Sequence, residues 1–240
     1  MTIKDMHYDF KKKLNKVDSQ QYRNLLIPEI DWALNEAQNV FIDIVSEPRL
    51  RTQLGFEKSQ KNIDDIRTLV IPDLCSTISN SGTIPEYNIL TLPENYRYFI
   101  RGDVYVTKGS CSKKIRITPQ EHDDEFEEDV FYKSSFEWKR VNALFVNTGL
   151  KIFSDSTFTH DRVCISYIKN PIYIHNAEDY RNGTYNLPGG QSLTGSVNCE
   201  LPIHTHGEIV DLAVMIISGE LQIPDYQIKY AKLNLNNLKQ

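Results

Sequence analysis

The stretch PEIDWALNEAQNVFIDI, residues 28–44, decides more about the fold than any other part of the chain. Its apolar residues recur every three to four positions, which is the spacing of one face of an α-helix. These residues are Ile30, Leu34, Ala37, Phe41 and Ile44. Pro28 suits a first helical turn, and Glu29 and Asp31 lie where the helix dipole favours acidic side chains. The pattern therefore predicts a helix that begins near Pro28 and ends before Pro48.

Helices are also expected toward both ends of the chain. Near the start, Met6, Phe10, Leu14 and Val17 share one helical face. Near the other end, residues 208–220 carry a second apolar face, which Gly219 and Pro224 bring to an end. A shorter helix is expected over residues 62–70, where Pro72 would stop it.

The middle of the chain has the texture of antiparallel strands, with β-branched and aromatic residues in short bursts between turn formers. The expected strands are residues 98–107, 113–118, 141–146, 150–153 and 163–168. Gly149 is expected to supply a positive φ angle in a hairpin between two of them. Residues 176–198 are polar and rich in glycine, which predicts a loop.

These patterns divide the chain into three parts. Residues 1–86 form an N-terminal helical part, residues 87–200 an antiparallel β region, and residues 201–240 a C-terminal helix and tail. The fold class expected from them is α+β. Five large aromatic residues are expected in the core, because most of them fall on the apolar phase of their elements. They are Trp32, Phe41, Trp138, Phe145 and Phe153.

The net charge of −5 arises from one segment, residues 121–129, which interrupts the β region. Its acidic residues are Glu121, Asp123, Asp124, Glu125, Glu127, Glu128 and Asp129. Elsewhere bases slightly outnumber acids, and both termini are positive. The global balance excludes a basic protein that coats nucleic acid.

Cysteine spacing and hydropathy bear on the environment of the chain. The longest aliphatic run, residues 212–217, is too short to span a membrane, and the N-terminus lacks the apolar core of a secretion signal. A soluble protein that stays in the cytoplasm is therefore expected. Cys75, Cys111, Cys164 and Cys199 form no closely spaced pair, which predicts reduced and mostly buried thiols.

One cluster has the composition of a metal site. His204, His206 and Glu208 bring two imidazoles and a carboxylate within five residues, and these are ligand types for a transition metal. The preferred interpretation is a polar helix entry, in which Thr205 or a neighbour caps the helix. A metal-dependent or ligand-binding β-domain that uses this cluster is kept as the alternative function. A binding module that recognises a ligand through residues 176–198 is a third hypothesis.

No catalytic motif is present in the sequence. The chain lacks the nucleophile elbow GxSxG, the zinc-protease motif HExxH and the dinucleotide motif GxGxxG. We therefore expect that the protein is not an enzyme and that it needs no cofactor.

Three patches of the sequence carry a family resemblance. The first is residues 28–38 followed by Phe41, and the second is Tyr-Ile-Lys-Asn-Pro at residues 167–171. The third comprises residues 201–204, 208–213 and 224–227. Together they resemble the head-tail connector proteins of tailed bacteriophages, the adaptor or ring proteins beneath the portal. They are most similar to the versions found in crAss-like phages of gut Bacteroidetes.

The resemblance implies a structural protein of the virion. It implies an α+β fold in which terminal helices pack as a helical bundle and an antiparallel β-sandwich or barrel is inserted between them. Copies of the chain would form a homo-oligomeric ring, expected to be a dodecamer, in the neck that joins capsid to tail. The chain would be made in the host cytoplasm and would have no contact with a membrane.

The resemblance also implies partners. These are the portal protein, the next connector or tail ring, and double-stranded DNA, which passes through the channel during packaging and ejection without sequence-specific binding. In this setting the acidic segment 121–129 is the candidate inter-subunit or channel-facing surface.

Overall fold

A computed structural model describes residues 1–14, 25–46, 61, 63–78, 86–120, 129 and 131–220. The chain divides into two compact units. Unit 1 joins Met1–Leu69 to Pro171–Gln240, and unit 2 is the continuous segment Val70–Asn170. Unit 1 thus includes residues 171–200, which the sequence patterns group with the β region.

Unit 2 is built on a seven-stranded sheet in the order β1-β7-β3-β4-β5-β6-β2. The strands are β1 (Val70–Thr77), β2 (Tyr87–Leu90), β3 (Tyr96–Lys108), β4 (Cys111–Gln120), β5 (Val141–Val146), β6 (Gly149–Phe153) and β7 (Thr159–Lys169). The five strands expected from the sequence are confirmed as β3 to β7. The sequence patterns missed β1 and β2, which are the two edge strands.

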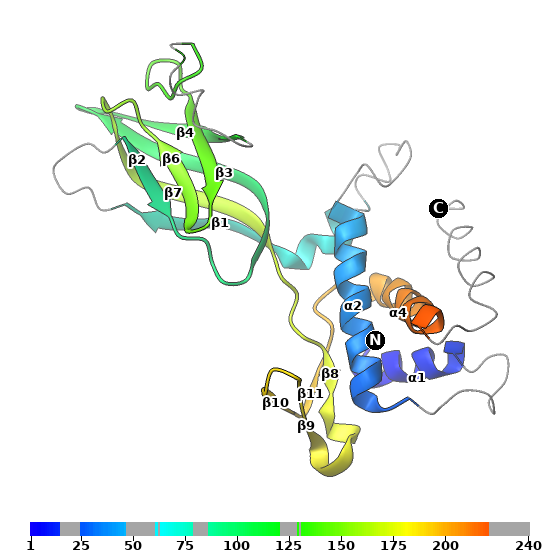
Figure 1. Cartoon of the computed structure of the whole chain (residues 1–240). Coiled ribbons are helices and arrows are strands. Elements are labelled where there is room, and N and C mark those ends of the chain that lie inside the picture. The colour runs from blue at the N-terminus through cyan, green and yellow to red at the C-terminus, as the bar shows by residue number, and fades with distance from the viewer. Residues whose placement is uncertain are drawn as a thin grey trace. The chain divides into compact units, whose positions relative to one another are not determined.

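The sheet curls on itself to form a half-barrel (Figure 1). The edge strand β2 and strand β7, which stand near opposite ends of the strand order, approach closely enough for a side-chain hydrogen bond. In it, Asn88 Nδ2 donates to His160 Nδ1 at 2.8 Å. The concave side buries one apolar cluster, which excludes water from the unit. Its members are Leu90, Val104, Val106, Ile115, Ile117, Phe136, Val141, Ala143, Leu150, Ile152, Phe158, Val163, Ile165 and Tyr167.

The expected antiparallel sandwich or barrel is wrong, because the sheet is mixed. Strands β4 and β5 pair in parallel, with Ile117 opposite Val141. Parallel neighbours require a crossover of a dozen or more residues, and residues 121–140 supply one. The acidic segment belongs to the connection between these two strands, and apart from Asp129 it lies outside the described residues.

Gly149 begins strand β6. Its φ angle is +144°, which confirms the prediction of a positive value. A Cβ atom at this position would lie 2.1 Å from the Leu90 carbonyl oxygen. The hairpin between β5 and β6 packs so closely on β2 that only glycine fits here.

Unit 1 contains the helices α1 (Ile3–Leu14), α2 (Ile27–Ser46) and α4 (His206–Glu220), all expected from the sequence. Residues 63–66 are also helical and run into the 3₁₀ turn η2 (Arg67–Leu69), so the expected helix over 62–70 ends early. Strand β1 begins at Val70 and accommodates Pro72 because it lies at a sheet edge. None of the helices in the described part of the chain is long and apolar enough to cross a membrane.

The expected α+β fold with a terminal helical bundle is wrong: the fold is mostly β, and its few helices are short. Helix α4 contacts α1 and α2, and α2 runs across the direction of the other two helices (Figure 1). Helix α2 also gives part of its buried surface to the extended segment 171–176 instead of to another helix. Helix α2 therefore divides its packing between helices and extended chain, whereas the helices of a bundle pack on one another along their length at about 20°.

The segment between β7 and helix α4 is more regular than expected, since the sequence predicted a loop over residues 176–198. It contains the short strands β8 (His175–Asn176), β9 (Thr184–Asn186), β10 (Ser192–Thr194) and β11 (Ser196–Val197). Strand β9 pairs with β10, and β8 pairs with β11. Ala177, Tyr185 and Leu193 form a small buried cluster beneath these strands.

Candidate functional site

The acidic segment lies almost entirely outside the described residues. Glu121, Asp123, Asp124, Glu125, Glu127 and Glu128 belong to that undescribed part, so their role stays a prediction. Asp129 is described, and its Oδ1 accepts a hydrogen bond from the Phe131 N–H at 2.8 Å. This bond fixes the start of the loop that follows the acidic segment.

That loop, residues 131–140, is called the aromatic loop because it exposes three large aromatic side chains. Phe131 is 86% exposed, Trp138 is 85% exposed and Tyr132 is 61% exposed. Lys133, Lys139 and Arg140 against Glu137 give the loop a positive net charge. The expectation that Trp138 belongs to the core is therefore wrong, since its indole lies in solvent.

Of the other four aromatic residues expected in the core, two are buried and two are exposed. Phe41 and Phe153 are buried, which confirms the prediction for them. Trp32 and Phe145 are both more than a third exposed, so for them the prediction is wrong. Helical or strand phase alone does not distinguish a core position from a partly exposed one.

The aromatic loop is held firmly although its aromatic side chains are exposed. Ser135 and Arg140 pair across it through two backbone hydrogen bonds of 2.8 and 3.0 Å. Arg140 Nη1 donates to the Phe131 carbonyl at 2.7 Å, and Asn142 Nδ2 donates to the Tyr132 carbonyl at 2.8 Å. Phe136, at the centre of the loop, is buried in the core of unit 2. The exposed rings therefore stand on a fixed base.

The metal-like cluster is dispersed in the structure. His204 Nε2 lies 2.8 Å from Asp65 Oδ1, and Glu208 pairs with Lys61 at 3.2 Å. His206 is buried, its Nε2 donates to the Leu201 carbonyl at 2.8 Å, and burial lowers its pKa. Among the described residues, no group of three or more His, Cys, Asp or Glu side chains is placed to hold a metal ion. The geometry gives no support to the metal-dependent alternative.

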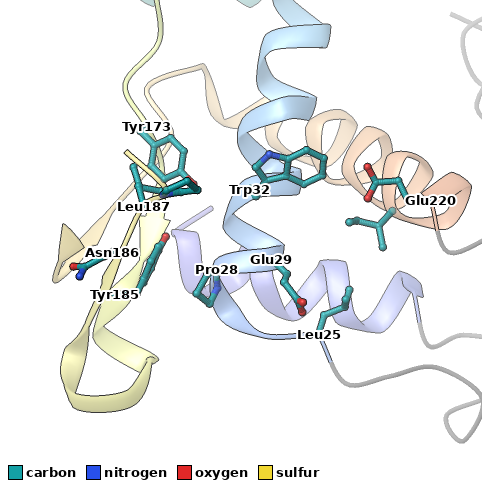
Figure 2. Close-up of a pocket in the computed structure, with 11 residues that line it drawn as sticks. Leu25, Pro28, Glu29, Trp32, Tyr173, Tyr185, Asn186, Leu187 and Glu220 are labelled. Carbon is teal, nitrogen blue, oxygen red and sulfur yellow. The ribbon is translucent and has the colours of Figure 1, made fainter. Parts of the chain in front are cut away.

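A pocket of about 470 Å³ lies in unit 1 (Figure 2). In Figure 2 Trp32 lies between Tyr173 and Leu187 on one side and Glu220 on the other, and Pro28 lies near Tyr185. The wall is mostly apolar and aromatic, and Glu29 and Glu220 add two carboxylates. The remaining lining residues are Leu25, Asn186, Pro188 and Ile217. The hypothesis of a binding module proposed that residues 176–198 recognise a ligand. Residues 185–188 of that segment line this pocket.

A polar stripe along helix α2 fixes one wall of this pocket. Asp31, Asn35 and Gln38 follow one another at spacings of four and three, and all three are buried. Asn35 bonds both backbone groups of Ile174, and Gln38 Nε2 donates to the Ile172 carbonyl at 3.2 Å. The stripe therefore supplies hydrogen-bond partners for backbone groups of the segment 172–176, whose last two residues also pair with β11. Periodicity of polar residues within an apolar helix is a signal that could have predicted it.

Asp31 is the one acidic residue of the stripe, and it is fully buried. Its Oδ1 accepts from His7 Nε2 at 2.7 Å. Its Oδ2 accepts from the Tyr185 hydroxyl at 2.7 Å and from the Asn176 N–H at 3.1 Å. Burial, followed by the hydrogen bond to Asp31, raises the pKa of Tyr185. The Tyr185 ring is thus locked as a neutral, immobile wall of the pocket.

No protein-family model matches the chain, and no curated protein matches it. Two features of the described residues are candidate binding sites. One is the aromatic loop of unit 2, and the other is the pocket of unit 1, which is lined by aromatic residues and two carboxylates. Both present aromatic side chains to solvent or to a cavity.

Proposed function

We propose that this chain is a structural subunit of a tailed-bacteriophage virion, one copy of a ring in the head-tail connector beneath the portal. The ring would join capsid to tail and let double-stranded DNA pass during packaging and ejection. Its role is structural, and the chemistry it needs is that of subunit contacts.

The aromatic loop is the observation that carries this proposal. Exposed aromatic side chains are enriched at protein interfaces, and arginine accompanies them there. Burying one such side chain contributes roughly 1.5–3 kcal/mol, so Phe131 and Trp138 together form a substantial anchor. Because the loop backbone is already fixed, little ordering entropy opposes the contact.

A ring follows if the loop meets a different surface on the next copy. Such head-to-tail contacts are heterologous, and they close into a ring when the rotation between copies allows it. The acidic segment 121–129 directly precedes the positively charged aromatic loop. We place both at the boundary between subunits or toward the channel, where opposite charges orient one copy on the next.

The sequence resemblance gives the proposal further support. Its first and third patches fall largely on α2 and on the region of α4, and these two helices contact each other in unit 1. Two of the three patches therefore lie largely on helices that pack together, while the second lies at the end of β7 in unit 2 and residues 224–227 lie outside the described residues.

Electron microscopy of the purified protein tests the proposal. We expect rings with a central channel at high protein concentration, and we expect Trp138→Ala to abolish them without lowering the melting temperature, because Trp138 is exposed. Tyr8→Ala, which removes a 72% exposed aromatic from unit 1, is the matched control and should leave the rings intact. Rings that form equally well without Trp138 would contradict the assignment of the loop.

A further inference from the structure

The pocket of unit 1 lies where the described part of the chain stops. Helix α4 ends at Glu220, and both Ile217 and Glu220 line the pocket. Twenty further residues, 221–240, follow directly. An extended chain spans about 3.4 Å per residue, so the first residues after Glu220 start at the pocket rim and need no long linker to enter it.

The composition of residues 221–240 complements the pocket. The segment carries eight large apolar or aromatic residues, which are Leu221, Ile223, Tyr226, Ile228, Tyr230, Leu233, Leu235 and Leu238. It also carries Lys229, Lys232 and Lys239 against one acid, Asp225. The pocket offers apolar walls and the carboxylates of Glu29 and Glu220. Apolar surface and opposite charge therefore match on the two sides.

The pocket walls are ready for such an occupant. Tyr185 is fixed by its bond to Asp31, and one oxygen of Glu29 accepts from the Leu26 N–H at 2.7 Å. Trp32 is 44% exposed, although half of the residues of its helix α2 are buried. A large aromatic ring that a rigid helix holds half in solvent is typical of a docking position.

We propose that the C-terminal segment 221–240 docks into this pocket on its own chain. Its apolar side chains pack on Trp32 and Tyr185, and its lysines approach Glu29 and Glu220. A segment tethered at the rim has an effective concentration in the millimolar range, which exceeds that of any free partner in dilute solution. This inference does not depend on ring assembly, because it concerns a single copy.

Trp32 reports on the occupant directly. The chain has two tryptophans, Trp32 and Trp138, so the Trp138→Phe variant leaves Trp32 as the only indole. In that variant, ending the chain after Glu220 should raise the acrylamide quenching constant of Trp32 about two-fold and shift its emission to the red. A synthetic peptide of residues 221–240, supplied at about 1 mM, should reverse both changes.

Paired substitutions within the segment separate docking from a general effect of charge. Leu221→Asp with Ile223→Asp should reproduce the quenching of the truncated chain. Asn236→Asp with Asn237→Asp introduces the same charge at polar positions of the same segment and should leave the quenching unchanged.

Two results would overturn the inference. If truncation leaves the quenching of Trp32 unchanged, the segment does not cover the pocket. If the protection of Trp32 rises with protein concentration, the occupant comes from a second copy and not from the same chain. Circular dichroism of each variant confirms that unit 1 is folded before quenching is compared.

Discussion

Asn35 holds the backbone of Ile174 with both ends of its side-chain amide. Its Nδ2 donates to the Ile174 carbonyl at 2.7 Å, and its Oδ1 accepts from the Ile174 N–H at 2.9 Å. The two residues lie 139 positions apart, so this pair fastens the return segment of the chain to the N-terminal helix. All the groups involved are buried, and each therefore needs its partner.

Replacing Asn35 should destabilise unit 1. Asn35→Ala leaves the N–H and C=O of Ile174 unpaired in a buried site, which should lower the free energy of unfolding by about 2–4 kcal/mol. Urea unfolding followed through Trp32, in a Trp138→Phe background, measures the change. Glu36→Gln alters an exposed neighbour on the same helix and should stay within about 0.5 kcal/mol of the parent. Equal effects of the two substitutions would disprove the role given to Asn35.

Gly149 should be the least tolerant glycine of unit 2. A Cβ atom there meets the Leu90 carbonyl oxygen at 2.1 Å, and φ is +144°. Gly149→Ala should therefore cost at least about 3 kcal/mol, visible as a large fall in melting temperature or as loss of folded protein. The control is Gly189→Ala, where a Cβ has nothing within 4 Å. A small effect at Gly149 would mean that β2 does not pack on this hairpin as described.

The cysteines correct the expectation of four reduced thiols. Cys75 of β1 and Cys164 of β7 face each other in the sheet and form a disulfide. Cys111 is free and exposed, whereas Cys199 is free and half-buried. The sequence spacing of 89 residues gave no hint of the pair, because the two cysteines meet only through the antiparallel pairing of β1 and β7.

Thiol titration checks this arrangement. In urea without a reductant we expect two reactive thiols per chain, and four after reduction. In the native protein Cys111 should react fast and Cys199 slowly, because burial raises the pKa of Cys199 to about 11 and the thiolate is the reactive form. The fast phase should vanish in Cys111→Ser. Four reactive thiols in urea alone would exclude the disulfide.

Stability of unit 2 should depend on pH through His160. Burial lowers the pKa of His160 from 6.5 to about 4, and a weaker hydrogen bond with the Phe153 backbone opposes this shift. As the pH falls below 6.5 the unfolded chain takes up a proton before the folded one, so acid favours unfolding. The free energy of unfolding should drop by about 3 kcal/mol between pH 6.5 and pH 4 from this residue alone.

Urea unfolding of unit 2 across this pH range is the measurement. His160→Gln should flatten the profile whatever its effect on stability at neutral pH, since glutamine does not titrate. His204→Gln changes a histidine of unit 1 and should leave the profile of unit 2 as it is. A profile that keeps its slope without His160 would assign the pH dependence to other groups.

The regular elements could be predicted because their patterns are local. Helix α2 and strands β3 to β7 show their periodicity in the sequence itself. Strand β1 was missed because Ile66 and Val70 have helical spacing, which Pro72 then interrupts. The pairing of β1 with β7 is a long-range contact that leaves no local pattern. The parallel pairing of β4 and β5 was missed for the same reason, since no local pattern records strand direction.

The candidate surfaces were harder to predict than the elements. The sequence pattern around Trp138 suggests a core residue. In the structure Phe136 of the same loop occupies the core, and the Trp138 indole is exposed. The pocket joins residues from α2, from the segment 173–188 and from α4. Such a site depends on the packing of distant segments and has no signature in any one of them.

The central claim is that the chain is a virion subunit of the connector ring. The most direct test is mass spectrometry of purified tailed particles of the phage that, on this proposal, encodes the sequence. We predict that the protein is present in every preparation, at a constant ratio to the portal protein that matches one ring per particle. Its absence from intact, tailed particles would contradict the account.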